Sequence, residues 1–150
     1  MTARRHRPYK RVTPEETIHR HIVAWLDAAL PPGSLMHHSP NEGKRHVSYQ
    51  KKLRLLGTKW GWPDLEVFVP LTYWRAETQP AGLFLEVKSA AGKVSIEQKK
   101  RHEELLDAGQ HIAIVKNLGQ VRSFLNPLIV LREDAAKAKI AWAAAEATGA

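Results

Sequence analysis

The amino-acid sequence predicts a single α/β domain, in which a mixed β-sheet is flanked by helices. Three short runs rich in Val, Ile, Phe and Leu, at 65–69, 83–87 and 112–115, are bounded by turn-forming residues and are typical of strands. Two longer stretches, 14–29 and 95–109, open with helix-capping residues and carry apolar side chains at helical spacing. The expected order of elements is helix, strand, helix, two strands, helix, strand, helix.

Composition restricts the class of protein. A chain of 150 residues suits one domain, and its surplus of eight positive charges suits a polyanionic partner such as nucleic acid. The same surplus also fits a nonspecific binder or simple solubility. With no cysteine, a disulfide framework and a thiolate metal site are both excluded. No apolar run approaches the roughly 18 residues of a membrane span, so we expect a cytoplasmic protein without a membrane partner.

The first helix is predicted to carry an acid toward the interior. Thr13-x-x-Glu16 has the spacing of a capping box, which gives Glu16 a structural role. Glu15 lies three residues before Ile18 and seven before Ile22, so it continues the inward-facing stripe of the helix. Glu15 therefore either reaches a buried site or remains an exposed first-turn acid favoured by the helix dipole.

A basic segment follows. Residues 35–43 are expected to form a short extended piece and a turn, and residues 44–57 a helix that ends at Gly57. Its basic side chains either contact phosphates or form a solvated helix face; the candidates for phosphate contacts are Arg45, Lys51 and Lys52.

Two strands carry the most informative polar residues. Side chains alternate along a strand, so Phe84, Glu86 and Lys88 share one face of the second strand. Asp64 lies at the start of the preceding strand. An acid and a lysine in an apolar strand need compensation, and a divalent cation between Asp64 and Glu86 would supply it. Alternatively, Glu86 and Lys88 form a half-exposed ion pair and Asp64 caps a turn after Pro63.

The combination of Pro63-Asp64 with Glu86-x-Lys88 resembles the signature of the PD-(D/E)xK nuclease superfamily. More narrowly, the chain is similar to stand-alone, phage-type VRR-NUC proteins over about residues 13–131. Asn41, Gly61 and Gln98 add to this likeness. The resemblance implies a restriction-endonuclease-like core.

The resemblance also implies a set of site residues. Metal ligands would be Glu15, Asp64, Glu86 and the backbone carbonyl of Val87. Lys88 would polarise the attacking water or steady the phosphate, and Gln98 would support the site. Capping of its own helix through Ser95 is the less favoured explanation of Gln98. DNA contacts would come from Asn41, Arg45, Lys51 and Lys52.

The implied activity is metal-dependent hydrolysis of DNA. Oxygen ligands point to Mg²⁺ or Mn²⁺, and the eight histidines show no convincing zinc spacing. Relatives of this type are typically homodimers that cut branched DNA such as four-way junctions or flaps, in a bacterial or phage-infected cell. The alternatives are a noncatalytic DNA-binding module that keeps the nuclease fold and, less favoured, an RNA-directed nuclease.

The remaining stretches complete the predicted organisation. Residues 1–12 are predicted to be a basic arm, 13–131 the nuclease-like domain and 132–150 an Ala-rich helix or tail. Within the domain, 120–131 is expected to be a terminal helix interrupted near Pro127. Tyr73 and Trp74 are expected to pack on the domain edge, with base stacking as the alternative.

Overall fold

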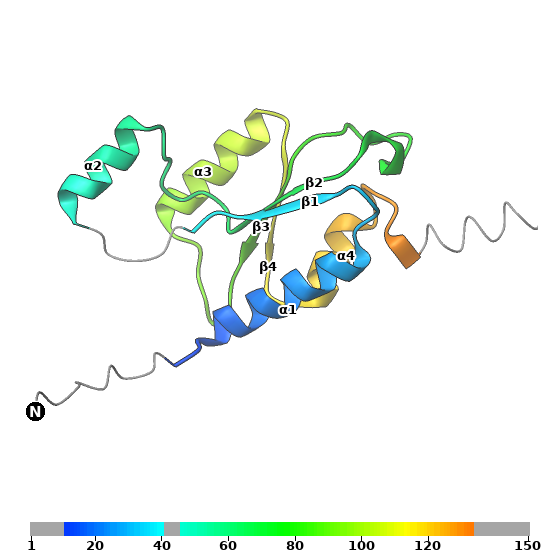
Figure 1. Cartoon of the computed structure of the whole chain (residues 1–150), viewed down its shortest axis with the longest axis horizontal. Helices are drawn as coiled ribbons and strands as arrows, with labels where there is room; N and C mark the ends of the chain where they lie inside the picture. Colours follow the sequence, from blue (N-terminus) through cyan, green and yellow to red (C-terminus); the bar gives the residue numbers. More distant parts are fainter. Residues whose placement is uncertain (1–10, 41–45, 134–150) are drawn as a thin grey trace, which may run out of the picture.

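The computed structural model describes residues 11–40 and 46–133 of the chain, and Figure 1 shows their arrangement. The elements, in order, are α1 (Pro14–Ala29), β1 (Leu35–His38), α2 (Val47–Leu55), β2 (Leu65–Phe68), the 3₁₀ turn η1 (Leu71–Tyr73), β3 (Leu83–Val87), α3 (Ile96–Asp107), β4 (His111–Val115) and α4 (Leu118–Leu125). The predicted order of helices and strands is confirmed. The predicted basic arm up to residue 10 and the tail from residue 134 lie outside the described residues, as do Asn41 and Arg45.

The four strands form one mixed sheet in the order β1-β2-β3-β4. β1 pairs with β2 and β2 with β3 in antiparallel fashion, whereas β3 and β4 run parallel. The parallel step requires a crossover, and α3 provides it. In Figure 1, α1 and α4 lie on one side of the sheet and α3 lies on the other. The predicted α/β class with a mixed sheet flanked by helices is therefore confirmed.

β3 is the central strand of the core, and all five of its residues are buried. Leu83, Leu85 and Val87 belong to the main hydrophobic cluster, which α1 and α4 complete from the same side. Phe84 and Glu86 are buried on the opposite face, which α3 covers. The alternation expected from the strand period is confirmed, but both faces are buried because helices cover the sheet on both sides.

The basic helix α2 is shorter than predicted and lies apart from the other helices and strands of the described chain (Figure 1). Its cap is His46, whose side chain accepts a hydrogen bond from the N–H of Ser48. No residue of α2 is buried. The turn that follows places Gly57 at a φ of 96°, in agreement with the predicted stop at this glycine.

The last helix begins earlier and ends earlier than predicted. Asn117 caps α4, and the chain leaves the helix at Leu125, before Pro127. The residues that follow return to the body, where Ile129 forms a β-bridge with Trp74. The Trp74 indole is buried and donates to the carbonyl of Val69 at 3.0 Å. Trp74 thus packs on the domain, as expected.

No helix among the described residues is long and apolar enough to span a membrane.

Candidate active site

Strand register brings Asp64 and Glu86 together. Leu65 pairs with Leu85 in the antiparallel β2–β3 ladder, so the residues one step further along each strand, Asp64 and Glu86, meet at the same end. The Asp64 carboxylate is fixed to the backbone of β3, because its Oδ2 accepts a 2.8 Å hydrogen bond from the N–H of Val87. The predicted meeting of these two acids is therefore present.

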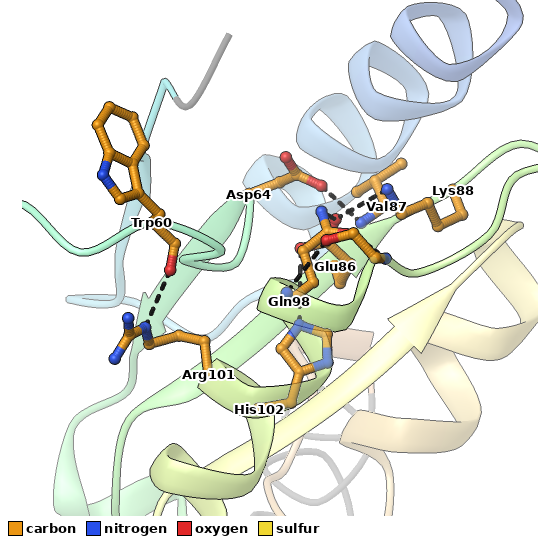
Figure 2. A network of polar contacts seen from close by, with 9 residues as sticks. Trp60, Asp64, Glu86, Val87, Lys88, Gln98, Arg101 and His102 are labelled. Atoms are coloured by element: carbon orange, nitrogen blue, oxygen red, sulfur yellow. Dashed lines mark hydrogen bonds and ion pairs between the residues drawn. The ribbon is translucent and has the colours of Figure 1, made fainter. Parts of the chain in front are cut away.

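The Glu86 carboxylate is buried and contacts two polar side chains. Its side chain is only 1% exposed. The Nε2 of Gln98 donates to Oε1 at 2.7 Å, and the Nζ of Lys88 lies 3.3 Å from the same oxygen. Figure 2 shows these side chains converging from β3, its end and α3. The alternative of a half-exposed ion pair on a solvated face is wrong, since α3 covers this face of the sheet.

Gln98 fulfils both roles that its position suggests. Ser95 and Gln98 form a complete capping box: the N–H of Ser95 donates to Oε1 of Gln98 at 2.9 Å, and the N–H of Gln98 donates to Oγ of Ser95 at 3.1 Å. The amide nitrogen at the other end of the side chain is left for Glu86. The capping role and the site contact are therefore simultaneous, and the start of α3 positions the acid.

The electrostatics of the pair favour protonated Asp64. Burial is the largest cause, and the neighbouring Glu86 charge adds to it, so the pKa of Asp64 is raised from 3.8 to about 7. The Glu15 carboxylate raises the pKa further, whereas the Val87 hydrogen bond and the Lys88 ammonium lower it. Three carboxyl groups, those of Glu15, Asp64 and Glu86, thus lie close enough to interact near one ammonium group, that of Lys88.

The N-terminus of α1 borders the same site. Glu15 is half-buried and lines an open pocket of about 240 Å³ together with His19, His38 and Asp64. The Coulombic effect of Glu15 on Asp64 agrees with this placement. Glu16 lines the same pocket, but its carboxylate is paired with Arg20 at 2.6 Å. As predicted, Thr13 caps the N–H of Glu16 at 3.1 Å. The return bond of a capping box is replaced by this i,i+4 ion pair.

The site has features that suit a divalent cation. The buried Oε2 of Glu86 has no hydrogen-bond partner within residues 11–40 and 46–133, and the charges of Asp64 and Glu86 repel each other. These oxygens are the ligand type that Mg²⁺ and Mn²⁺ prefer. The described residues nevertheless contain no group of three or more His, Cys, Asp and Glu side chains already arranged around one point. The ligand set of Glu15, Asp64, Glu86 and the Val87 carbonyl remains a prediction.

The turn before Asp64 is held by the Trp62 indole and by the backbone of Trp60. The ring of Trp62 meets Phe84 edge-on at 5.7 Å, and its Nε1 donates to Glu66. The carbonyl of Trp60 accepts a 3.0 Å hydrogen bond from Nε of Arg101 on α3, as Figure 2 shows. The Trp62 contacts attach the turn before Asp64 to β2 and β3, and the Trp60–Arg101 bond attaches it to the helix that carries Gln98.

Two histidines near the acids were not predicted to contribute. The Nδ1 of His38 donates to the carbonyl of Asp64 at 2.8 Å. The Nε2 of His102 lies 3.8 Å from Oε2 of Glu86. A signal for His102 existed in the sequence, because it follows Gln98 by one helical turn on the stripe that faces β3. No sequence signal identifies His38, because its contact depends on the pairing of β1 with β2.

Two of the four predicted DNA contacts, Lys51 and Lys52, lie on α2, apart from this centre (Figure 1). Lys51 and Lys52 are exposed on α2, and Asn41 and Arg45 lie outside the described residues. The placement of the two lysines is compatible with phosphate contacts or with a solvated helix face, the two readings that the sequence left open.

Comparisons with known proteins identify the fold. Neither protein-family models nor curated proteins match the chain. A solved structure described as a VRR_NUC domain protein matches with a TM-score of 0.57 and 23% sequence identity, over 77% of this chain and 88% of that one. The predicted resemblance is therefore confirmed in three dimensions, and the chain has the fold of a VRR_NUC domain protein.

Proposed function

We propose that this protein is a divalent-metal-dependent endodeoxyribonuclease of the PD-(D/E)xK type. The observation that supports the proposal is the arrangement at one end of β2 and β3. Glu86 contacts Lys88 and Gln98, and Asp64 is bonded to the backbone of Val87 beside it. A buried acid with a half-buried acid next to it is costly for stability, even beside a lysine, and the cost is understandable when the two acids bind a cation for catalysis.

The acids would hold the metal. Asp64 and Glu86 are the principal ligands, with the Val87 carbonyl and Glu15 completing the set. When bound, Mg²⁺ or Mn²⁺ supplies an activated water and neutralises charge on the phosphate. The Val87 N–H keeps one oxygen of Asp64 oriented, which leaves the other free to turn toward the pocket beside Glu15.

Lys88 and Gln98 would act on the reacting groups and on Glu86. The Lys88 side chain is 12% exposed, so its ammonium is close to the surface while remaining within 3.3 Å of Glu86. From this place it would donate to the attacking water or to a phosphate oxygen. Gln98 keeps Oε1 of Glu86 from rotating and would thereby preserve the order of the ligands.

DNA is the proposed substrate because the chain carries eight excess positive charges. Phosphate contacts are assigned to Asn41, Arg45, Lys51 and Lys52. Branched DNA as the preferred substrate and a homodimeric assembly rest on the family resemblance alone. Light scattering after gel filtration tests the assembly, and a monomer as the sole species would contradict it.

The decisive experiment is cleavage of end-labelled linear, flap and four-way DNA, and of an RNA duplex, with Mg²⁺ or Mn²⁺. We expect the wild type to cut DNA, and Asp64→Ala and Lys88→Ala each to lower the rate by at least about 100-fold. Glu77→Gln, which changes an exposed acid outside the site, is the matched control and should cut like the wild type.

A noncatalytic DNA-binding module makes the opposite prediction. It would bind the labelled DNA, leave it intact with either metal, and bind equally well after Asp64→Ala. Cleavage of the RNA duplex in preference to DNA would instead reassign the substrate.

A further inference from the structure

Two buried polar atoms, one on the Glu86 carboxylate and one on α3, face each other and have no hydrogen-bond partner among the described residues. They are Oε2 of Glu86 and Nε2 of His102, and they lie 3.8 Å apart. An N–H···O hydrogen bond measures about 2.9 Å, so this contact is open by roughly 1 Å. Because buried polar atoms in folded proteins are nearly always satisfied, the pair calls for a physical explanation.

His102 lies where it can hold the oxygen of Glu86 that Gln98 does not hold. The two residues are one turn apart on α3, and both side chains point toward β3 in Figure 2. Gln98 donates to Oε1 and His102 faces Oε2, so α3 presents one side chain to each oxygen of the carboxylate. The His102 residue is 7% exposed, which keeps competing water away from the contact.

We propose that His102 is a positioning residue for Glu86: its ring carries the proton on Nε2 and donates it to Oε2 of the carboxylate. This inference rests on the proposed function, because orienting Glu86 matters most if Glu86 binds a metal. A carboxylate held at both oxygens from α3 has a fixed plane, so the lone pairs left to a cation have a fixed direction.

The first test reads the tautomer and needs neither metal nor activity. Long-range ¹H–¹⁵N spectra of the wild type at pH 8 should show the His102 ring protonated at Nε2, with a shift that changes in Glu86→Gln. A ring protonated at Nδ1 with a bare Nε2 would overturn the proposal, because a bare nitrogen cannot donate to Glu86.

The second test separates positioning from structure by measuring Mn²⁺ affinity and thermal unfolding of the same variants. His102→Leu keeps an apolar filling but removes the donor, and should weaken Mn²⁺ binding about tenfold. His102→Gln places an amide N–H near the position of Nε2 and should restore most of that loss. Leu105→Ala, at another buried position of α3, is the control: it should lower the melting temperature and leave Mn²⁺ affinity unchanged.

The outcomes distinguish this proposal from the proposed function. The positioning role is contradicted if His102→Leu binds Mn²⁺ as tightly as the wild type, or if His102→Gln does not restore the affinity. His102 would then only fill space in the core. If the wild type binds no Mn²⁺, the nuclease assignment fails, and the tautomer alone then decides whether His102 holds Glu86.

Discussion

At the scale of single residues, the central feature is an acid whose ionisation opposes folding. Asp64 is raised to a pKa of about 7 from 3.8, so the native state retains a proton that the unfolded chain has already released. In this window stability must fall as pH rises, because the unfolded state binds fewer protons than the native state. The contribution is fully present below pH 3.8 and is lost as pH passes through about 7.

Asp64→Asn should remove this dependence in metal-free buffer. Relative to wild type, the variant should gain stability as pH rises from about 4 to 8, by on the order of 1–2 kcal/mol once solvent screening of this partly exposed group is allowed for. Urea unfolding across this range measures the difference. Asp107→Asn, which changes an exposed acid at the end of α3, should track the wild type; a constant offset for Asp64→Asn at every pH would contradict the argument.

At the scale of elements, the turn before β2 and the start of α3 are built as one unit. Gly61 has a φ of 72°, and a Cβ there would lie 2.6 Å from the carbonyl oxygen of Glu97 and 2.9 Å from the nitrogen of Gln98. The Trp60–Arg101 hydrogen bond strengthens the same contact. Since the turn leads into Asp64 and the helix carries Gln98, this close approach of two backbones sets the distance between them.

Gly61→Ala should therefore destabilise the protein more than Gly57→Ala. Both glycines have positive φ, at 72° and 96°, but a Cβ at Gly57 meets nothing within 4 Å. We expect about 1–2 kcal/mol for the backbone conformation in either variant, and about 1–3 kcal/mol more for the collision at Gly61. Urea unfolding of the two variants gives the comparison directly. Equal losses would show that the backbones have room to separate.

The sequence predicted those features of the site that depend on residues close together in the chain. The strand period placed Glu86 opposite the apolar face of β3, and the Ser95–Gln98 spacing located the start of α3. It did not give the burial of Glu86, because only tertiary assembly covers that face with α3. The Glu16–Arg20 ion pair was not predicted, because the Glu16 carboxylate has two partners within reach along the helix. These are the backbone N–H of Thr13, three residues before it, and the Arg20 guanidinium, four residues after it. The role of Asp64 as an acceptor for Val87 required the register of two strands.

At the scale of the whole molecule, one group of basic side chains, on α2, lies apart from the acid pair. α2 carries exposed lysines and lies beyond the layered body in Figure 1, whereas the acid pair lies at the sheet. A helix without buried residues contributes little to the core, and the exposed lysines of α2, Lys51 and Lys52, are placed where a polyanion can reach them.

Replacing Lys51 and Lys52 with alanine should weaken DNA binding without lowering the melting temperature. Each lost phosphate contact should reduce the slope of log affinity against log salt by about one, so the double variant should lose about two. Fluorescence anisotropy at several salt concentrations measures the slope. Arg122→Ala, on the opposite side of the sheet in α4, is the basic control. An unchanged slope in the lysine variant would identify α2 as a solvated face only.

The double engagement of Gln98 links two properties that usually vary independently. Its carbonyl oxygen helps to begin a helix, and its amide nitrogen steadies an acid on a neighbouring strand. Glutamate at this position would preserve the first task and set two negative groups against each other in the second. Alanine would abandon both. We therefore expect a substitution of Gln98 to be tolerated only together with a compensating change of Glu86 on β3. Among homologous sequences, the residues at these two positions should vary together.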